Sequence, residues 1–221
     1  MTVQRIISQA DPFAFGLWAG LAQPLGRNQM PVGATIRPER IADHEVITEV
    51  VSAAFSGRPY SDGTEAQLVQ ELRAQCALSV SLVAETAGAV VGHIAFSPAF
   101  PADGTSRCFA LGPVAVLPGL QRKGIGSALI IKGLEAIRTL GANACILVGD
   151  PCYYSRFGFV LSPPDAPTDQ PAQYFMVKHF GDCRPVGPIS FHRAFKRAAY
   201  KTLLQTAGLA AARPPGVEES T

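Results

Sequence analysis

The spacing of apolar residues changes along the chain, and each change predicts a different kind of element. Residues 39–55 and 64–74 place apolar side chains every three or four positions, which is typical of helices that bury one face. Thr64 lies where it would cap the second of these helices. The apolar stripe expected for the first helix consists of Ile41, Val46, Val50 and Ala54.

The middle of the chain instead contains continuous runs of Val, Ile, Leu and Ala, which favour buried strands. Residues 79–85 and 90–96 form two such runs, and Ala87-Gly88 between them predicts a hairpin turn. Further strands are expected at 35–38, 108–117, 144–148 and 173–180.

A third helical pattern begins at Ile125, between the strands at 108–117 and 144–148, and Gly141 lies where it would end such a helix. A strand, a helix and a second strand in this order predict a parallel crossover. The apolar face expected for this helix consists of Ile125, Leu129, Ile130, Leu134 and Ile137.

A basic turn joins the strand at 108–117 to this helix. N–H groups at a helix start have no partner within the helix and carry partial positive charge. Glycines let such a backbone approach an anion closely, so the turn is predicted to hold a pyrophosphate. A tight turn that binds nothing is the alternative. The turn reads Gln121-Arg122-Lys123-Gly124-Ile125-Gly126-Ser127.

Two common phosphate motifs do not describe this turn. The string G-x-x-x-x-G-K-S/T of the P-loop is absent, and the dinucleotide motif G-x-G-x-x-G fails because Leu129 stands at the third glycine. What does match is Q/R-x-x-G-x-G/A, the acyl-CoA signature of the GNAT acetyltransferases, through Gln121, Gly124 and Gly126.

A second motif follows downstream and resembles the F-Y-x-K-x-G-F element of the same superfamily. Tyr153 stands at the Phe position, Tyr154 at the Tyr position and Arg156 at the Lys position, while Gly158 and Phe159 match directly. From about residue 34 to residue 180 the chain therefore resembles a GNAT N-acetyltransferase, of the bacterial kind with a G-D-P-x-Y-Y-x-R-F-G-F string. This resemblance implies an α/β (mixed α+β) fold, with a central, mixed, mostly antiparallel twisted sheet of about six to seven strands flanked by helices.

The resemblance also implies which residues bind and act. Acetyl-CoA would be the acyl donor and an unidentified primary amine the acceptor, with direct attack in a ternary complex. Tyr154 would donate a hydrogen bond or proton to the departing thiolate, although a packing role for this aromatic ring stays open. The cofactor would be held by edge backbone groups of one strand and by the turn that follows it: Val114, Ala115, Val116, Gln121, Arg122, Lys123, Gly124, Ile125, Gly126 and Ser127.

The general base is not identified by the sequence. The strand segment 109–116 contains no acidic residue, so the proton could pass through water. His93 titrates in a suitable range, but a structural strand histidine is favoured. Asp150 is explained as a helix cap. Cys152 at the start of a short helix leaves an acyl-cysteine route as a minor alternative.

The acceptor is expected to contact loops. Arg58, Tyr60 and Asp62 between the first two helices are candidates, as is the proline-rich loop at 162–171. They could equally be solvated residues without a ligand. The sequence does not say which amine is used.

Composition limits the remaining questions. The net charge of +2 is too small to imply nucleic acid, and no apolar run is long enough to span a membrane. The five cysteines and four histidines show no metal-ligand spacing, so no metal is expected. The odd number of cysteines predicts free thiols and a cytoplasmic location. A homodimer is left open.

Three regions are expected: an N-terminal extension at 1–32, a GNAT domain at 33–181 and a basic extension at 182–221 that is helical and packs on the domain. An alternative function is a non-catalytic module that binds CoA or acyl-CoA and uses this basic tail to meet a partner.

Overall fold

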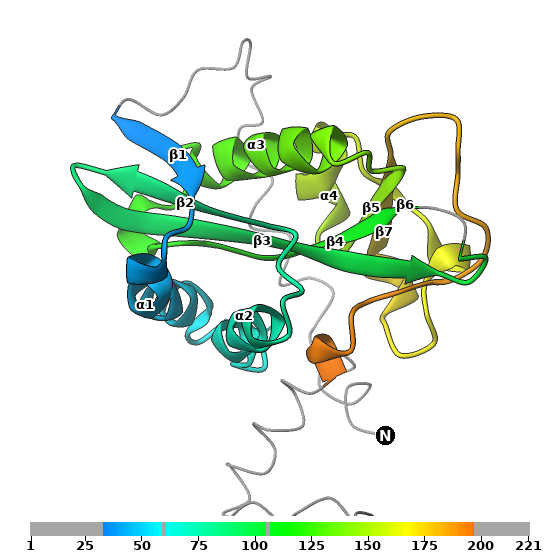
Figure 1. The fold of residues 1–221 in the computed structure, drawn as a ribbon, viewed down its shortest axis with the longest axis horizontal. Helices are drawn as coiled ribbons and strands as arrows, with labels where there is room; N and C mark the ends of the chain where they lie inside the picture. The colour runs from blue at the N-terminus through cyan, green and yellow to red at the C-terminus, as the bar shows by residue number, and fades with distance from the viewer. Residues whose placement is uncertain (1–32, 59–60, 105–106, 197–221) are drawn as a thin grey trace, which may run out of the picture.

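The computed structural model describes residues 33–58, 61–104 and 107–196. They form one eight-stranded sheet in the order β1-β2-β3-β4-β5-β7-β6, with β8 paired to β3 (Figure 1). All pairs are antiparallel except β4 with β5. The strands are β1 (Ala34–Pro38), β2 (Val80–Thr86), β3 (Ala89–Pro101), β4 (Cys108–Val116), β5 (Ala144–Val148), β6 (Val160–Leu161), β7 (Phe175–His179) and β8 (Ile189–Ser190).

This sheet confirms the predicted mixed and mostly antiparallel architecture, with two short strands, β6 and β8, that the sequence did not indicate. The hairpin of β2 and β3 turns at Ala87 and Gly88, whose φ angles of 50° and 80° are both left-handed. Such a turn matches the right-handed twist of the two strands.

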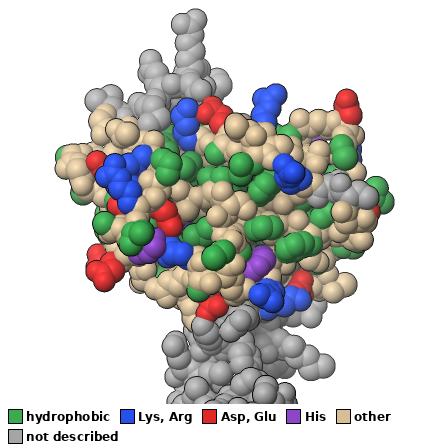
Figure 2. Space-filling model, viewed as in Figure 1, with side chains coloured by type: hydrophobic (Ala, Val, Ile, Leu, Met, Phe, Trp, Pro, Cys, Tyr) green, Lys and Arg blue, Asp and Glu red, His purple; other side chains and the backbone are tan. Residues whose placement is uncertain are grey.

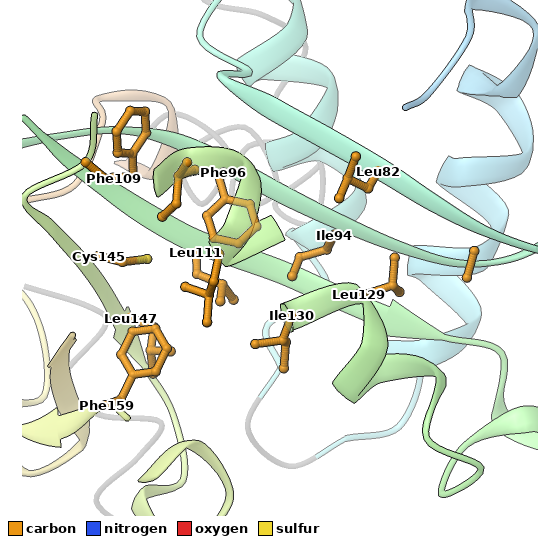
Figure 3. Close-up of a cluster of buried hydrophobic side chains, with 14 of the residues drawn as sticks. Leu82, Ile94, Phe96, Phe109, Leu111, Leu129, Ile130, Cys145, Leu147 and Phe159 are labelled. Carbon is orange, nitrogen blue, oxygen red and sulfur yellow. The ribbon is translucent and has the colours of Figure 1, made fainter. Parts of the chain in front are cut away.

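Helices cover both faces of the sheet. On one face lie α3 (Ile125–Thr139) and the short α4 (Pro151–Tyr154); on the other lie α1 (His44–Phe55) and α2 (Glu65–Ala74) (Figure 1). The apolar face predicted for α3 is buried as expected, and Gly141 ends the helix with a φ of 80°. Figure 3 shows side chains from β3, β4, β5 and α3 converging in the largest cluster of the core.

The stripe predicted for the first helix is partly wrong. Ile41 is 86% exposed, whereas Ile47 and Val51 are buried together with Val50 and Ala54. The cause lies in a 3-10 turn at Ile41–Asp43 that precedes α1 and shifts the phase of the pattern.

That turn is held by Asp43, which is buried. Its carboxylate accepts hydrogen bonds from Arg37 at 2.6 and 3.0 Å and from the Arg40 backbone N–H at 2.7 Å. The hydrogen bonds from Arg37 hold the pKa of Asp43 at about 2, well below its usual range.

Thr64 also departs from its predicted role. It stands at the start of α2, but its hydroxyl makes no capping bond to the helix. It donates instead to Asp62 Oδ1 at 2.6 Å, and the Thr64 N–H donates to the same oxygen at 3.0 Å. Asp62 therefore organises the end of the loop between α1 and α2.

The extension predicted to be helical at 182–221 is described as far as residue 196. Within this part, Ile189 and Ser190 form the strand β8, and helical backbone begins at residue 194. Ala194 is fully buried beside Leu68 and Leu72 of α2. The predicted extension at 1–32 and the rest of the basic tail at 197–221 lie outside the described residues.

Charges on the visible surface are mixed. On the face drawn in Figure 2, basic and acidic side chains are interspersed rather than gathered by sign. Among the helices of residues 33–58, 61–104 and 107–196, none is both long and apolar enough to cross a lipid bilayer.

Candidate active site

The central opening of the sheet lies where β4 leaves β5. The two strands pair only at Cys108–Ala110 with Ala144–Ile146, although β4 runs on to Val116. Beyond that point Gly112 and Pro113 form a bulge opposite the single residue Ala95 of β3. A bulge bends its strand, and proline has no N–H for a ladder. The geometry therefore leaves an edge of β4 that β5 does not cover.

The three residues expected at this edge do not contribute equally. Successive residues of a strand direct their backbone groups to opposite sides. The Leu117 N–H donates to Val91 O of β3 at 3.0 Å, so the backbone groups of Ala115 also face β3. Val114 and Val116 face the open edge.

The turn after β4 has two residues in the left-handed region, Arg122 with φ of 61° and Gly124 with φ of 85°. Gly124 occupies the cap position of α3 and has no side chain with which to cap the helix. The first turn of α3 contains no acidic residue. Free N–H groups at the start of a 15-residue helix form a site for an anion.

Neither backbone conformation nor side-chain packing requires a glycine at position 126, in that first turn. Its φ lies outside the left-handed region, and a Cβ built there would meet Tyr153 Oη at 3.5 Å and Val116 Cγ2 at 3.7 Å. Both are ordinary van der Waals distances. A side chain as small as that of alanine would therefore fit at this position, so packing within the protein does not explain the glycine.

Cations surround this positive helix end. Arg122 and Lys123 are exposed in the turn. Arg156 is brought to the same place from the second motif, with Nη2 3.3 Å from Ser127 Oγ and Cζ 4.1 Å from the centroid of the Tyr153 ring. Cations at a helix N-terminus are unfavourable unless an anion lies between them. Sequence reasoning assigned Arg156 no role, although its place at the motif's Lys position was a signal.

The Gln121 side chain supports the turn rather than facing outward. Its Nε2 donates to Val116 O at 2.9 Å, and its Oε1 accepts from Arg58 Nη2 at 3.0 Å. Arg58 was expected to contact the amine acceptor. It lies instead against the turn from Gln121 to Ser127. Tyr60, the candidate beside it, lies outside the described residues.

Tyr154 lies one aromatic ring away from the turn. It contacts Tyr153 edge to face at 5.0 Å between centroids and Phe159 at 6.0 Å. Its helix α4 begins as predicted, since Asp150 Oδ1 accepts from the Cys152 N–H at 2.9 Å. The two sequence motifs are thus brought together in space, with the phenol of Tyr153 beside Gly126.

His93 lies on β3 opposite Ala115 of β4 and is fully buried, in a polar network on the face covered by α1 and α2. Ser81 Oγ donates to Glu39 at 2.5 Å, so the same oxygen accepts from His93 Nε2–H at 2.9 Å. Arg73 forms two further bonds to Glu39 at 2.9 and 3.0 Å. His93 Nδ1 is then an acceptor that finds no partner among the described residues.

The electrostatics of the network keep His93 neutral. Burial lowers the pKa of His93 to about 4, against the opposing charge of Glu39. Burial alone would raise the pKa of Glu39, but the hydrogen bonds from Arg73 and Ser81 outweigh it and lower that pKa. A fully buried imidazole with this pKa is a poor general base at neutral pH.

The remaining candidates are simpler. Cys152 is exposed and all five cysteines are free thiols. The described ranges contain no group of three or more His, Cys, Asp or Glu side chains able to hold a metal ion.

Comparisons with known proteins agree with this geometry. The pattern of the Acetyltransferase (GNAT) family matches residues 46–159. The uncharacterized N-acetyltransferase YhbS of Escherichia coli K12 is 35% identical over 110 residues, which span 49% of this chain and 66% of that protein. The uncharacterized N-acetyltransferase YjhQ of the same strain is 36% identical over 144 residues, which span 64% of this chain and 77% of that protein.

Two solved structures are similar over most of the described fold. A GNAT family acetyltransferase from Brucella melitensis, in complex with acetyl-CoA, is 43% identical with a TM-score of 0.65 and covers 73% of this chain and 97% of its own. YhbS from Escherichia coli, in complex with CoA, is 28% identical with a TM-score of 0.69 and covers 78% of this chain and 97% of its own.

Proposed function

The chain belongs to the GNAT family of acetyltransferases, and we propose that it moves an acetyl group from acetyl-CoA to a primary amine. The observation that carries this proposal is the start of α3, which lies beside Val116 at the open edge of β4 and beside Tyr153, the neighbour of Tyr154 in α4. Support comes from the Brucella relative, which binds acetyl-CoA, and from YhbS, which binds CoA.

Cofactor binding follows from the arrangement of the site. The pyrophosphate would accept hydrogen bonds from backbone N–H groups of the turn from Gln121 to Ser127. Arg122, Lys123 and Arg156 would add positive charge around it. The pantetheine arm would lie along β4 and bond to the edge groups of Val114 and Val116.

The chemistry then needs few protein groups. The free amine attacks the thioester carbon, the C–N bond forms, and the C–S bond breaks as the thiolate leaves with the electron pair. Tyr154 would donate a hydrogen bond or proton to that sulfur. The proton lost by the amine would pass to water, because β4 carries no acid and His93 is buried. Holding both substrates together would supply much of the rate.

The test is turnover with Tyr154→Phe. With acetyl-CoA and a panel of small amines, lysine peptides and protein N-termini, we expect the wild type to release CoA with at least one acceptor. The variant should retain acetyl-CoA affinity while its kcat falls roughly 100-fold, the usual size of a lost proton donor. Unchanged kcat in the variant would remove the role given to Tyr154.

A second candidate is a module that binds CoA or acyl-CoA without turnover and meets a partner through its basic tail. The absence of an acid on β4 and the burial of His93 are the observations that favour it. Binding of acetyl-CoA without acetyl transfer to any amine of the panel would support this candidate over the enzyme.

The domain organisation is part of the proposal. Residues 33–181 would form the acetyltransferase domain, with an extension on each side. Whether two copies of the chain associate is a separate question. Because β8 pairs with β3 and Ala194 is buried against α2, a chain that ends at residue 181 should be less stable than one that ends at 196. Comparing the thermal melting of the two chains tests the difference in stability. Measuring the mass of each in solution tests whether two copies associate.

A further inference from the structure

Gly149, between β5 and α4, lies directly beneath the ring of Tyr154. A Cβ built on Gly149 would come within 2.8 Å of Tyr154 Cδ2 and closer still to Cε2. It would also lie 3.1 Å from Leu147 Cδ1, which is the flexible end of a side chain. The aromatic ring therefore packs on the glycine backbone so closely that a Cβ at position 149 would force the ring to move.

The backbone of Gly149 gives no other reason for a glycine. Its φ does not lie in the left-handed region, so any L-residue could adopt this conformation. Its N–H donates to Tyr174 O at 3.0 Å, a bond that every residue except proline can make. Only the position of Tyr154 excludes a side chain here.

Other groups hold the ring from the remaining sides. Tyr153 and Phe159 both meet it edge to face, at interplanar angles of 82° and 77°. Phe159 is 1% exposed and cannot retreat easily. The N-terminus of α4 is fixed by the Asp150 cap. The ring of Tyr154 is therefore packed against Gly149, Tyr153 and Phe159, and these contacts restrict its orientation.

We propose that Gly149 is a positioning residue that fixes the direction of the Tyr154 phenol toward the thioester sulfur. This inference rests on the proposed function, because it gives Gly149 an effect only through Tyr154. A methyl group at position 149 would tilt the ring, and the hydroxyl at its far end would move furthest. A shift of about 1 Å in a reacting group can cost roughly 100-fold in rate.

The test compares Gly149→Ala with Gly181→Ala. Gly181 is a matched control, because it is exposed, has no left-handed φ, and has no neighbouring atom within 4 Å of the point where a Cβ would lie. We expect Gly149→Ala to lower kcat roughly 10- to 100-fold while the acetyl-CoA Kd from calorimetry stays within about twofold. Gly181→Ala should change neither quantity.

The decisive step repeats the substitution in Tyr154→Phe. If Gly149 acts only by aiming the hydroxyl, the double variant should have the same kcat as Tyr154→Phe alone. A further loss that multiplies with the first would overturn the proposal, as would an unchanged kcat in Gly149→Ala.

Two further measurements test the proposal if Gly149→Ala does not fold or if the wild type shows no activity. If Gly149→Ala does not fold, adding Tyr154→Ala should restore folding, since the ring is the obstacle; a double variant that stays unfolded contradicts the proposal. If the wild type acetylates no amine, the proposed function fails on its own. The ring position is then read from 3-fluorotyrosine NMR, in which the Tyr154 signal must shift in Gly149→Ala and not in Gly181→Ala.

Discussion

Gly133 and Gly126 lie two turns apart on the same helix, yet the structure explains only one of them. A Cβ on Gly133 would come within 2.6 Å of Phe96 Cζ, so the core ring excludes a side chain. A Cβ on Gly126 would meet only ordinary contacts. The first glycine serves packing, whereas the second leaves a space that the protein does not fill.

The polar groups of the two regions differ in the same way. Under α1 and α2, Glu39 bonds to Arg73 and Ser81, and Ser81 bonds to His93. At the start of α3 the cap residue has no side chain, and Arg156 lies beside the positive end. In the first region the charge of Glu39 is matched by Arg73, whereas the first turn of α3 has no acidic residue to match its positive end. The second region is therefore the one suited to an anionic ligand.

The largest effect is expected when the packing glycine is changed. Gly133→Ala should lower the free energy of unfolding by about 2 kcal/mol, because overpacking costs up to about 3 kcal/mol and alanine returns about 1 kcal/mol of helix propensity. Gly126→Ala should not lower it, because its Cβ meets only ordinary contacts and alanine adds up to about 1 kcal/mol of helix propensity. Urea unfolding of both variants measures this, and equal losses would erase the distinction between the two glycines.

A smaller effect on stability is expected when the pH is lowered, and it arises from His93 in the network with Glu39, Arg73 and Ser81. The pKa of His93 is about 4 in the folded chain and near 6.5 when unfolded, so the unfolded chain binds the proton first as pH falls. Stability is then lost on acidification, by about 1.5 kcal/mol between pH 6.5 and pH 5. His93→Gln should flatten this part of the curve in urea unfolding. An equally steep curve in the variant would assign the pH dependence to other groups.

The smallest effect is expected for the cation at the open end. Arg156→Gln should weaken acetyl-CoA binding about 5- to 10-fold and reduce its dependence on salt, because one charge near the phosphates is lost. Arg138→Gln, in the last turn of the same helix, is the control and should leave affinity unchanged. Similar losses for both arginines would indicate a general charge effect rather than a contact.

Much of the fold could be predicted because its signals are local. The apolar face of α3, the turn at Ala87-Gly88 and the cap by Asp150 depend on neighbours within a few residues, and the structure has all three. The exposure of Ile41 could not be predicted, because it depends on Asp43 being drawn inward by Arg37. The strand β8 is two residues long and forms only through its partner β3.

In the candidate site, too, the local features could be predicted from the sequence and the contacts between distant segments could not. The turn from Gln121 to Ser127 and the tyrosine motif were visible as strings of residues. The approach of Arg156 to Ser127, the contact of Arg58 with Gln121 and the ring of Tyr154 on Gly149 are contacts between distant segments, which no spacing rule encodes.

Calorimetry of acetyl-CoA with wild type, Gly126→Glu and Gly181→Glu would show directly whether the open end of α3 binds the cofactor. The glutamate at position 126 places bulk and negative charge over the helix start without backbone strain, and the one at 181 adds the same charge on an exposed loop. We expect wild type and Gly181→Glu to bind acetyl-CoA and Gly126→Glu to lose at least about 100-fold in affinity. Equal affinity in all three folded proteins would contradict this expectation, because the open end of α3 would then not be where the cofactor binds.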